Sequence, residues 1–143
     1  MSQIEKSIEV DVSLRIAYTQ WTRFDTFPLF LDGVEEITYV SDVLTRWKTR
    51  IDGVEREFDA EITEQIPDER VAWKTVGQPN WAAVVTFEHL DDAKTKITLQ
   101  RIYTPQGLTE KLGDRLGHVK RRAAGDLKNF KQYIESRSAR SGY

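Results

Sequence analysis

Hydrophobic and polar side chains alternate along the first eleven residues of the chain. Ile4, Ile8 and Val10 fall on one face of this segment, and mainly polar or charged residues fall on the other. A period of two is typical of a strand with one buried face. We therefore predict an N-terminal strand over residues 3–11.

The next twenty residues carry signals for two short helices. Ser13 is a suitable N-cap for a first helix, whose apolar face includes Ala17 and Trp21. A second helical turn is expected from Asp25, and it ends at Asp32-Gly33, where glycine can adopt a positive φ.

From residue 34 to residue 104 the chain is rich in β-branched and aromatic residues, with turn signals every eight to twelve positions. This pattern predicts six strands in the segment.

The clearest turn signal is Asp52-Gly53, a two-residue hairpin sequence of the type I′ kind. Pairing residues outward from it places three opposite charges across from each other on one face: Arg50 with Glu55, Lys48 with Glu57, and Arg46 with Asp59. The other face pairs Ile51 with Val54, Trp47 with Phe58, and Thr45 with Ala60. A slip of one residue would invert every side chain, so this register is well specified.

The last segment predicts one long amphipathic helix. Its apolar residues are spaced 4, 4, 3, 4, 4, 3 and 4 apart and lie within an arc of about 100°; they are Leu108, Leu112, Leu116, Val119, Ala123, Leu127, Phe130 and Ile134. Pro105 suits the first turn. Asp126 lies at the edge of the stripe, and residues 136–143 are expected to form a flexible tail.

This order of elements, together with several short sequence motifs, resembles the START-related polyketide cyclase/dehydrase and lipid-transport superfamily. The motifs are Ser13–Trp21, the aromatic series Phe24, Phe27 and Phe30, the segment Pro67–Trp73, the turn Leu90-Asp91-Asp92 and the segment Tyr103-Thr104-Pro105. The resemblance covers nearly the whole chain. It implies a helix-grip fold of the α+β class, in which a seven-stranded curved antiparallel sheet holds the C-terminal helix and leaves a cavity between them. The length and the absence of internal repeats and linkers indicate one domain over residues 1–143. Members of this superfamily bind or act on different molecules, so the fold alone does not choose a function.

Composition and missing motifs exclude several classes of function. The chain has 143 residues, 39% of them apolar and 31% charged, and no apolar stretch of the length that a membrane span needs. It contains no cysteine, and it lacks the catalytic and nucleotide-binding motifs G-x-S-x-G, H-E-x-x-H, G-x-G-x-x-G and the P-loop. We therefore expect a cytoplasmic protein without a metal or cofactor. The formal charge of −2 hides an asymmetry, because residues 1–104 carry a net charge of −7 and residues 105–143 a net charge of +5.

The interior face of the predicted sheet supplies the candidate ligand site. Aromatic rings with a few polar groups are what a planar or lipid-like ligand requires. The candidate lining residues are Trp47, Thr49, Phe58, Trp73, Thr75, Trp81, Val85, Phe87, Leu99, Arg101, Tyr103, Leu112 and Leu116. Arg101 and Tyr103 are the candidate catalytic residues. By strand phase Arg101 points inward, where a charge must meet a carboxylate such as Glu64, reach the rim, face a ligand oxygen, or be turned outward by a β-bulge.

Three functions remain open at this point. The first is binding of a hydrophobic small molecule (polyketide-, quinone- or lipid-like) between the sheet and the C-terminal helix. The second, which the family resemblance implies, is an aromatase/cyclase reaction on a poly-β-ketone in the same pocket. The third is contact with a partner protein or an anionic membrane surface through the basic helix that carries Lys120, Arg121 and Arg122. A nucleic-acid partner is not expected, because the strand aromatics point inward instead of forming a stacking platform.

Overall fold

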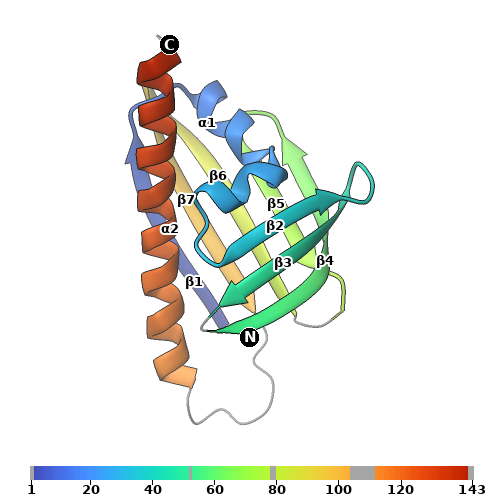
Figure 1. Cartoon of the computed structure of the whole chain (residues 1–143). Coiled ribbons are helices and arrows are strands. Elements are labelled where there is room, and N and C mark those ends of the chain that lie inside the picture. Colours follow the sequence, from blue (N-terminus) through green and yellow to red (C-terminus); the bar gives the residue numbers. More distant parts are fainter. Residues whose placement is uncertain (1, 52, 78–79, 104–111, 142–143) are drawn as a thin grey trace.

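The structure is a computed structural model that describes residues 2–51, 53–77, 80–103 and 112–141. Two short helices follow the first strand, six more strands follow these helices, and a long helix ends the chain (Figure 1). In chain order the elements are β1 (Ser2–Val10), α1 (Leu14–Trp21), the 3₁₀ helix η1 (Phe24–Leu29), β2 (Val34–Tyr39), β3 (Leu44–Ile51), β4 (Val54–Ile66), β5 (Arg70–Thr75), β6 (Trp81–Asp91), β7 (Lys94–Tyr103) and α2 (Leu112–Ser141).

The seven strands form one antiparallel sheet in the order β1-β7-β6-β5-β4-β3-β2. The sheet curves so that α1, η1 and α2 lie on its inner side (Figure 1). This arrangement confirms the α+β helix-grip architecture. Because β1 pairs with β7, the first strand closes one edge of a sheet that is otherwise a simple meander.

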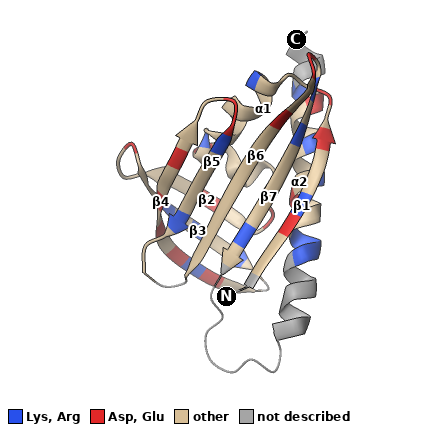
Figure 2. Ribbon diagram, turned by 180° about the vertical axis from the view of Figure 1, so that it is seen from behind, with Lys and Arg blue, Asp and Glu red and all other residues tan. Residues whose placement is uncertain are grey.

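The hairpin of β3 and β4 has the register that the sequence predicts. Arg50 lies opposite Glu55, Trp47 lies opposite Phe58, and the pairing is regular from the turn to Leu44. On the outer face the Arg50 guanidinium donates to the Glu55 carboxylate. Figure 2 shows acidic and basic positions side by side on the ribbons of these strands. Pairs of this kind add about 0.2–1 kcal/mol each, so their main effect is to fix which face is buried.

The chain segment between β1 and β2 is shaped by a cap and a glycine. The Ser13 hydroxyl accepts a hydrogen bond from the Ile16 N–H at 3.3 Å, which caps α1 as expected. Gly33 has a φ of +88° and its carbonyl accepts from the Arg50 N–H at 2.8 Å, so the turn after η1 is attached to β3. The second predicted helical turn is therefore present, as a 3₁₀ helix.

The core lies between the inner face of the sheet and the three helices. The apolar stripe of α2 is buried in the part of the helix whose side chains are described, at Ala123, Leu127, Phe130 and Ile134. Residues 104–111, including Leu108 and Pro105, lie outside the described residues. The helix continues to Ser141, beyond residue 136 where the sequence predicts a tail.

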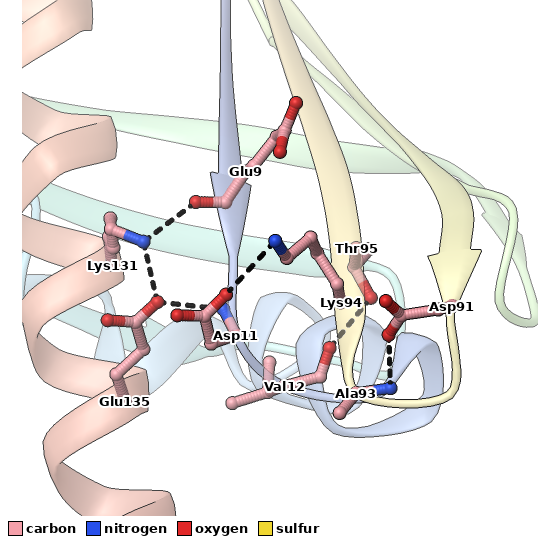
Figure 3. Close-up of polar contacts among 9 residues, drawn as sticks. All are labelled: Glu9, Asp11, Val12, Asp91, Ala93, Lys94, Thr95, Lys131 and Glu135. Carbon is pink, nitrogen blue, oxygen red and sulfur yellow. Dashed lines mark hydrogen bonds and ion pairs between the residues drawn. The ribbon is translucent and has the colours of Figure 1, made fainter.

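A polar network joins the C-terminal half of α2 to the end of β1 (Figure 3). The Lys131 ammonium donates to the Glu9 carbonyl at 2.9 Å and to the Glu135 carboxylate at 2.7 Å. The Glu135 carboxylate also accepts from the Asp11 N–H at 2.7 Å. Partial burial raises the pKa of Glu135, but the Lys131 and Asp11 hydrogen bonds and the Lys131 charge outweigh burial, and the pKa falls below its usual value.

Candidate functional site

The predicted site residues near α1 and η1 belong to a tightly packed aromatic cluster. Trp73 lies 5.5 Å from Phe27 and 6.5 Å from Trp21, measured between ring centroids, and Trp47 lies 6.0 Å from Phe27. The Trp47 Nε1–H donates to the buried Thr45 hydroxyl at 2.8 Å, so its polar atom is satisfied inside the protein. In this part of the fold the rings fill the space between sheet and helices.

Three further predicted site residues lie in the same filled region. Val85, Phe87 and Leu99 are buried, and the Phe87 ring meets the Tyr18 ring of α1 edge-on at 5.6 Å. As ligand contacts these three residues stay a prediction. Their described role is to form the core beneath α1.

The opposite end of the inner face lies near the turns β3–β4 and β5–β6; we call it the open end of the sheet. Trp81 is half-buried there, with the Phe58 ring edge-on at 5.4 Å. The Arg56 guanidinium lies 6.0 Å from the Trp81 ring. Thr75 bonds to the backbone of Trp81, accepting from its N–H at 2.9 Å and donating to its carbonyl at 3.2 Å.

Thr49 differs from the other polar residues of the inner face. Its side chain is on the same face as Trp47, the residue is 3% exposed, and its hydroxyl oxygen has no hydrogen-bond partner in the part of the chain that the structure describes. An unsatisfied buried hydroxyl costs about 1–3 kcal/mol. Such a group therefore marks a place where a ligand atom or a water molecule would be stabilising.

Arg101 points inward, as its strand phase predicts, and no bulge turns it outward. It lies opposite Ile4 of β1 and Ala83 of β6 in regular registers. Its guanidinium donates to the Asp126 carboxylate of α2 at 2.7 Å, with side-chain exposures of 22% for Arg101 and 2% for Asp126. The expected alternative partner, Glu64, instead pairs with Arg70 at 3.7 Å, because it follows an irregularity in β4 between Ile62 and Glu64.

The Asp126 carboxylate joins three elements of the fold. One oxygen accepts from Arg101 of β7, and the other accepts from the Asp32 N–H, in the turn after η1, at 3.0 Å. Burial raises the pKa of Asp126, and this effect exceeds the opposing influence of Arg101, the Asp32 hydrogen bond and Arg122. In the sequence, Asp126 is recognisable as an acidic residue at the edge of the apolar stripe of the helix. That position does not show that Arg101 and Asp32 are its partners.

A pocket of about 250 Å³ lies beside this ion pair, between the turn after η1 and α2. Its lining residues are Asp32, Arg121, Arg122, Gly125, Asp126 and Asn129. None of them is among the predicted ligand-lining residues. The pocket is therefore a separate feature from the apolar space that the sequence predicts.

Three predicted site residues, Tyr103, Leu112 and Leu116, have side chains that lie outside the described residues. Within the described residues no three metal-binding side chains come together, and none of the helices is long and apolar enough to cross a membrane.

The strand order and the helix on the inner face place the chain among the proteins with a helix-grip fold. Solved structures share this fold. The Zhui aromatase/cyclase from Streptomyces sp. R1128 matches with a TM-score of 0.82 and 12% identity, over 95% of this chain and 94% of that one. A START superfamily protein from Mycobacterium smegmatis matches with a TM-score of 0.77 and 12% identity, over 94% and 97%.

Sequence comparison gives the family. The model of the family described as "Polyketide cyclase / dehydrase and lipid transport" matches residues 10–132, and the chain belongs to this family. A protein of Streptomyces lincolnensis, described as an uncharacterized 17.2 kDa protein in the melC2-rnhH intergenic region, is 57% identical over 143 residues, covering 99% of this chain and 95% of that protein. Membership of the family supports a role in binding hydrophobic ligands.

Proposed function

We propose that the protein binds a hydrophobic small molecule, polyketide-, quinone- or lipid-like, at the open end of the sheet between the inner face and α2. The observation that carries this proposal is the buried hydroxyl of Thr49 on an aromatic face, which has no hydrogen-bond partner among the residues that the structure describes. The half-buried Trp81 supplies a ring surface there, and Arg101, whose guanidinium is paired with Asp126, lies on the same face of the sheet. A ligand with an apolar ring system and an oxygen substituent matches these groups.

The packed cluster around Trp21 and Trp73 limits the size of this space. Because those rings already contact one another, the ligand is expected to contact Thr49, Phe58 and Trp81 but not Trp73. Of the lining residues that the sequence predicts, the proposal therefore keeps only those at the open end of the sheet as ligand contacts.

The test is a thermal-shift and fluorescence titration with three probes, one from each class: emodin, menadione and lysophosphatidylcholine. A true ligand at one hundred times its dissociation constant stabilises the native state by about 2.7 kcal/mol. We expect saturable stabilisation by at least one probe, with a change in tryptophan emission. The absence of any saturable shift with all three probes would refute the proposal.

Thr49→Val makes this test specific. It removes the hydroxyl while keeping the shape, so the unliganded protein should be as stable as the wild type or up to about 1 kcal/mol more stable, because an unsatisfied group is lost. Ligand affinity should fall about tenfold, since a hydrogen bond to the ligand is worth about 1.5 kcal/mol. Thr38→Val, at an exposed position of β2, is the matched control and should change neither quantity.

A second candidate function is ring closure of a poly-β-ketone at the same place, and the inward position of Arg101 favours it. A guanidinium can stabilise the enolate oxygen that forms during an aldol reaction. The test is turnover of a poly-β-ketone thioester by the wild type and by Arg101→Lys, which keeps the charge but loses the forked geometry. Turnover that Arg101→Lys abolishes while menadione or emodin still binds would support catalysis. Binding without turnover in the wild type would exclude catalysis on that substrate.

A further inference from the structure

The pocket between the turn after η1 and α2 has a feature that packing does not explain. Gly125 lies in the wall of the pocket, inside a helix, and a Cβ added there would meet no atom within 4 Å. Glycine in a helix interior lowers helix stability relative to alanine. Since no close contact requires this glycine, its effect is to keep the pocket open.

The charges around the pocket favour an anionic occupant. Arg121 and Arg122 both line it. Of the two acids in its wall, Asp126 is neutralised by Arg101 at 2.7 Å and offers one oxygen to the Asp32 N–H. Only Asp32 adds an exposed negative charge. Arg122 also acts on the charge of Asp126, so the guanidinium groups of Arg101, Arg121 and Arg122 stand against the carboxylates of Asp32 and Asp126 and leave one net positive charge.

Arg122 lies beside the turn after η1. Its Nη1 atom lies 3.3 Å from the position that a Cβ of Gly33 would take, so the absence of a side chain at Gly33 leaves room for the guanidinium there. Asn129, about one helical turn after Gly125 in α2, adds a side-chain amide to the wall of the pocket.

We propose that this pocket binds a small phosphate monoester. Guanidinium groups bind phosphate oxygens through paired N–H donors, and Asn129 adds a donor for a third oxygen. Asp32, across the pocket, is an acceptor for a hydroxyl of the ester. The volume of about 250 Å³ is below the range of about 300–1,000 Å³ typical of drug-sized ligands, so the occupant is small. This site is separate from the hydrophobic ligand site proposed above, and neither proposal depends on the other.

The test is an NMR titration of the full chain in a phosphate-free buffer, with sodium phosphate and then glycerol 3-phosphate as probes at constant ionic strength. We expect saturable shifts of the Gly33, Gly125 and Asn129 amide signals, with tighter binding of glycerol 3-phosphate than of inorganic phosphate. The absence of saturation with both probes would overturn the proposal.

Variants separate a built site from general charge attraction. Arg121→Gln and Arg122→Gln should each weaken binding at least fivefold. Lys128→Gln makes the same charge change at an exposed position of α2 outside the pocket and should change the affinity less than twofold. Equal weakening by all three variants would show that only net charge matters and would refute the site.

Gly125→Leu provides a test that leaves all charges in place. The side chain enters open space, so the fold should be kept, and thermal unfolding checks this. Phosphate binding should be lost. Unchanged binding in the folded variant would refute the pocket as the site, and if the variant fails to fold, Gly125→Ala gives the same test with a smaller expected loss.

The source of the phosphate is distinguished by vesicles. Cosedimentation with phosphatidic acid vesicles that Arg121→Gln abolishes and glycerol 3-phosphate inhibits would assign the site to a lipid headgroup. Binding of glycerol 3-phosphate without cosedimentation would assign it to a water-soluble ester.

Discussion

The buried ion pair of Arg101 and Asp126 gives the sharpest prediction about stability. In Arg101→Met the Asp126 carboxylate, 2% exposed, keeps its hydrogen bond from the Asp32 N–H but loses its counter-charge at 2.7 Å. Removing one partner of a buried pair costs about 3–5 kcal/mol. The whole stability of a domain is about 5–15 kcal/mol, so this one change removes a large part of it.

Replacing the acidic partner, Asp126, should lower the free energy of unfolding by less than replacing Arg101. Asp126→Asn keeps an oxygen for the Asp32 N–H, and Arg101, 22% exposed, retains some contact with water. We expect a loss of about 1.5–3 kcal/mol, the range of a hydrogen bond to a charged group. The double variant Arg101→Met/Asp126→Asn should be more stable than Arg101→Met alone, because it leaves no uncompensated charge.

The pH dependence has a definite sign. Burial already raises the pKa of Asp126, and removing Arg101 raises this pKa further. A carboxyl whose pKa is higher in the folded state than in the unfolded state favours folding at low pH and loses that contribution as the pH rises through the folded-state pKa. The cost of Arg101→Met should therefore be smaller at pH 5 than at pH 7. Urea unfolding followed by circular dichroism measures this as a shift in midpoint at constant slope. A cost below about 1 kcal/mol at pH 7, or one that does not change with pH, would refute the reasoning.

Three further outcomes follow from single contacts. Thr45→Val should destabilise the protein by about 1–3 kcal/mol, because the Trp47 Nε1–H loses its buried acceptor at 2.8 Å, and urea unfolding measures the loss. Gly33→Ala should lower the melting temperature, because φ is +88° and the new Cβ would lie 2.9 Å from a β3 side chain; an unchanged melting temperature would contradict the described turn. Glu135→Gln should reduce stability at pH 7 and have less effect at acid pH, because the pKa of Glu135 is lowered by folding and its contribution is lost as the pH falls through that value; unfolding across a pH series checks this.

The fold was predictable because its main signals are local. The hairpin register follows from charges a few residues apart on either side of one turn, and the structure pairs Arg50 with Glu55 as predicted. The inward direction of Arg101 follows in the same way from strand alternation. These patterns need no knowledge of distant residues.

The site was less predictable because it depends on how distant elements pack. Strand phase shows that Trp47 and Trp73 point inward, but only the positions of α1 and η1 show that Phe27 and Trp21 fill the space between them. The partner of Arg101 could not be chosen either, since Asp126 reaches it only when α2 docks on the sheet. The pocket beside Gly125 arises from the same docking against the turn after η1.

The outermost strand β2 has a consequence for self-association. Its backbone forms one border of the sheet, and unpaired strand borders attract further strands from other molecules. Here an irregularity between Val34 and Glu36 interrupts the regular pairing, which makes this border a poorer template for a further strand. The irregularity opposes polymerisation through β2, although the sheet does not close into a barrel.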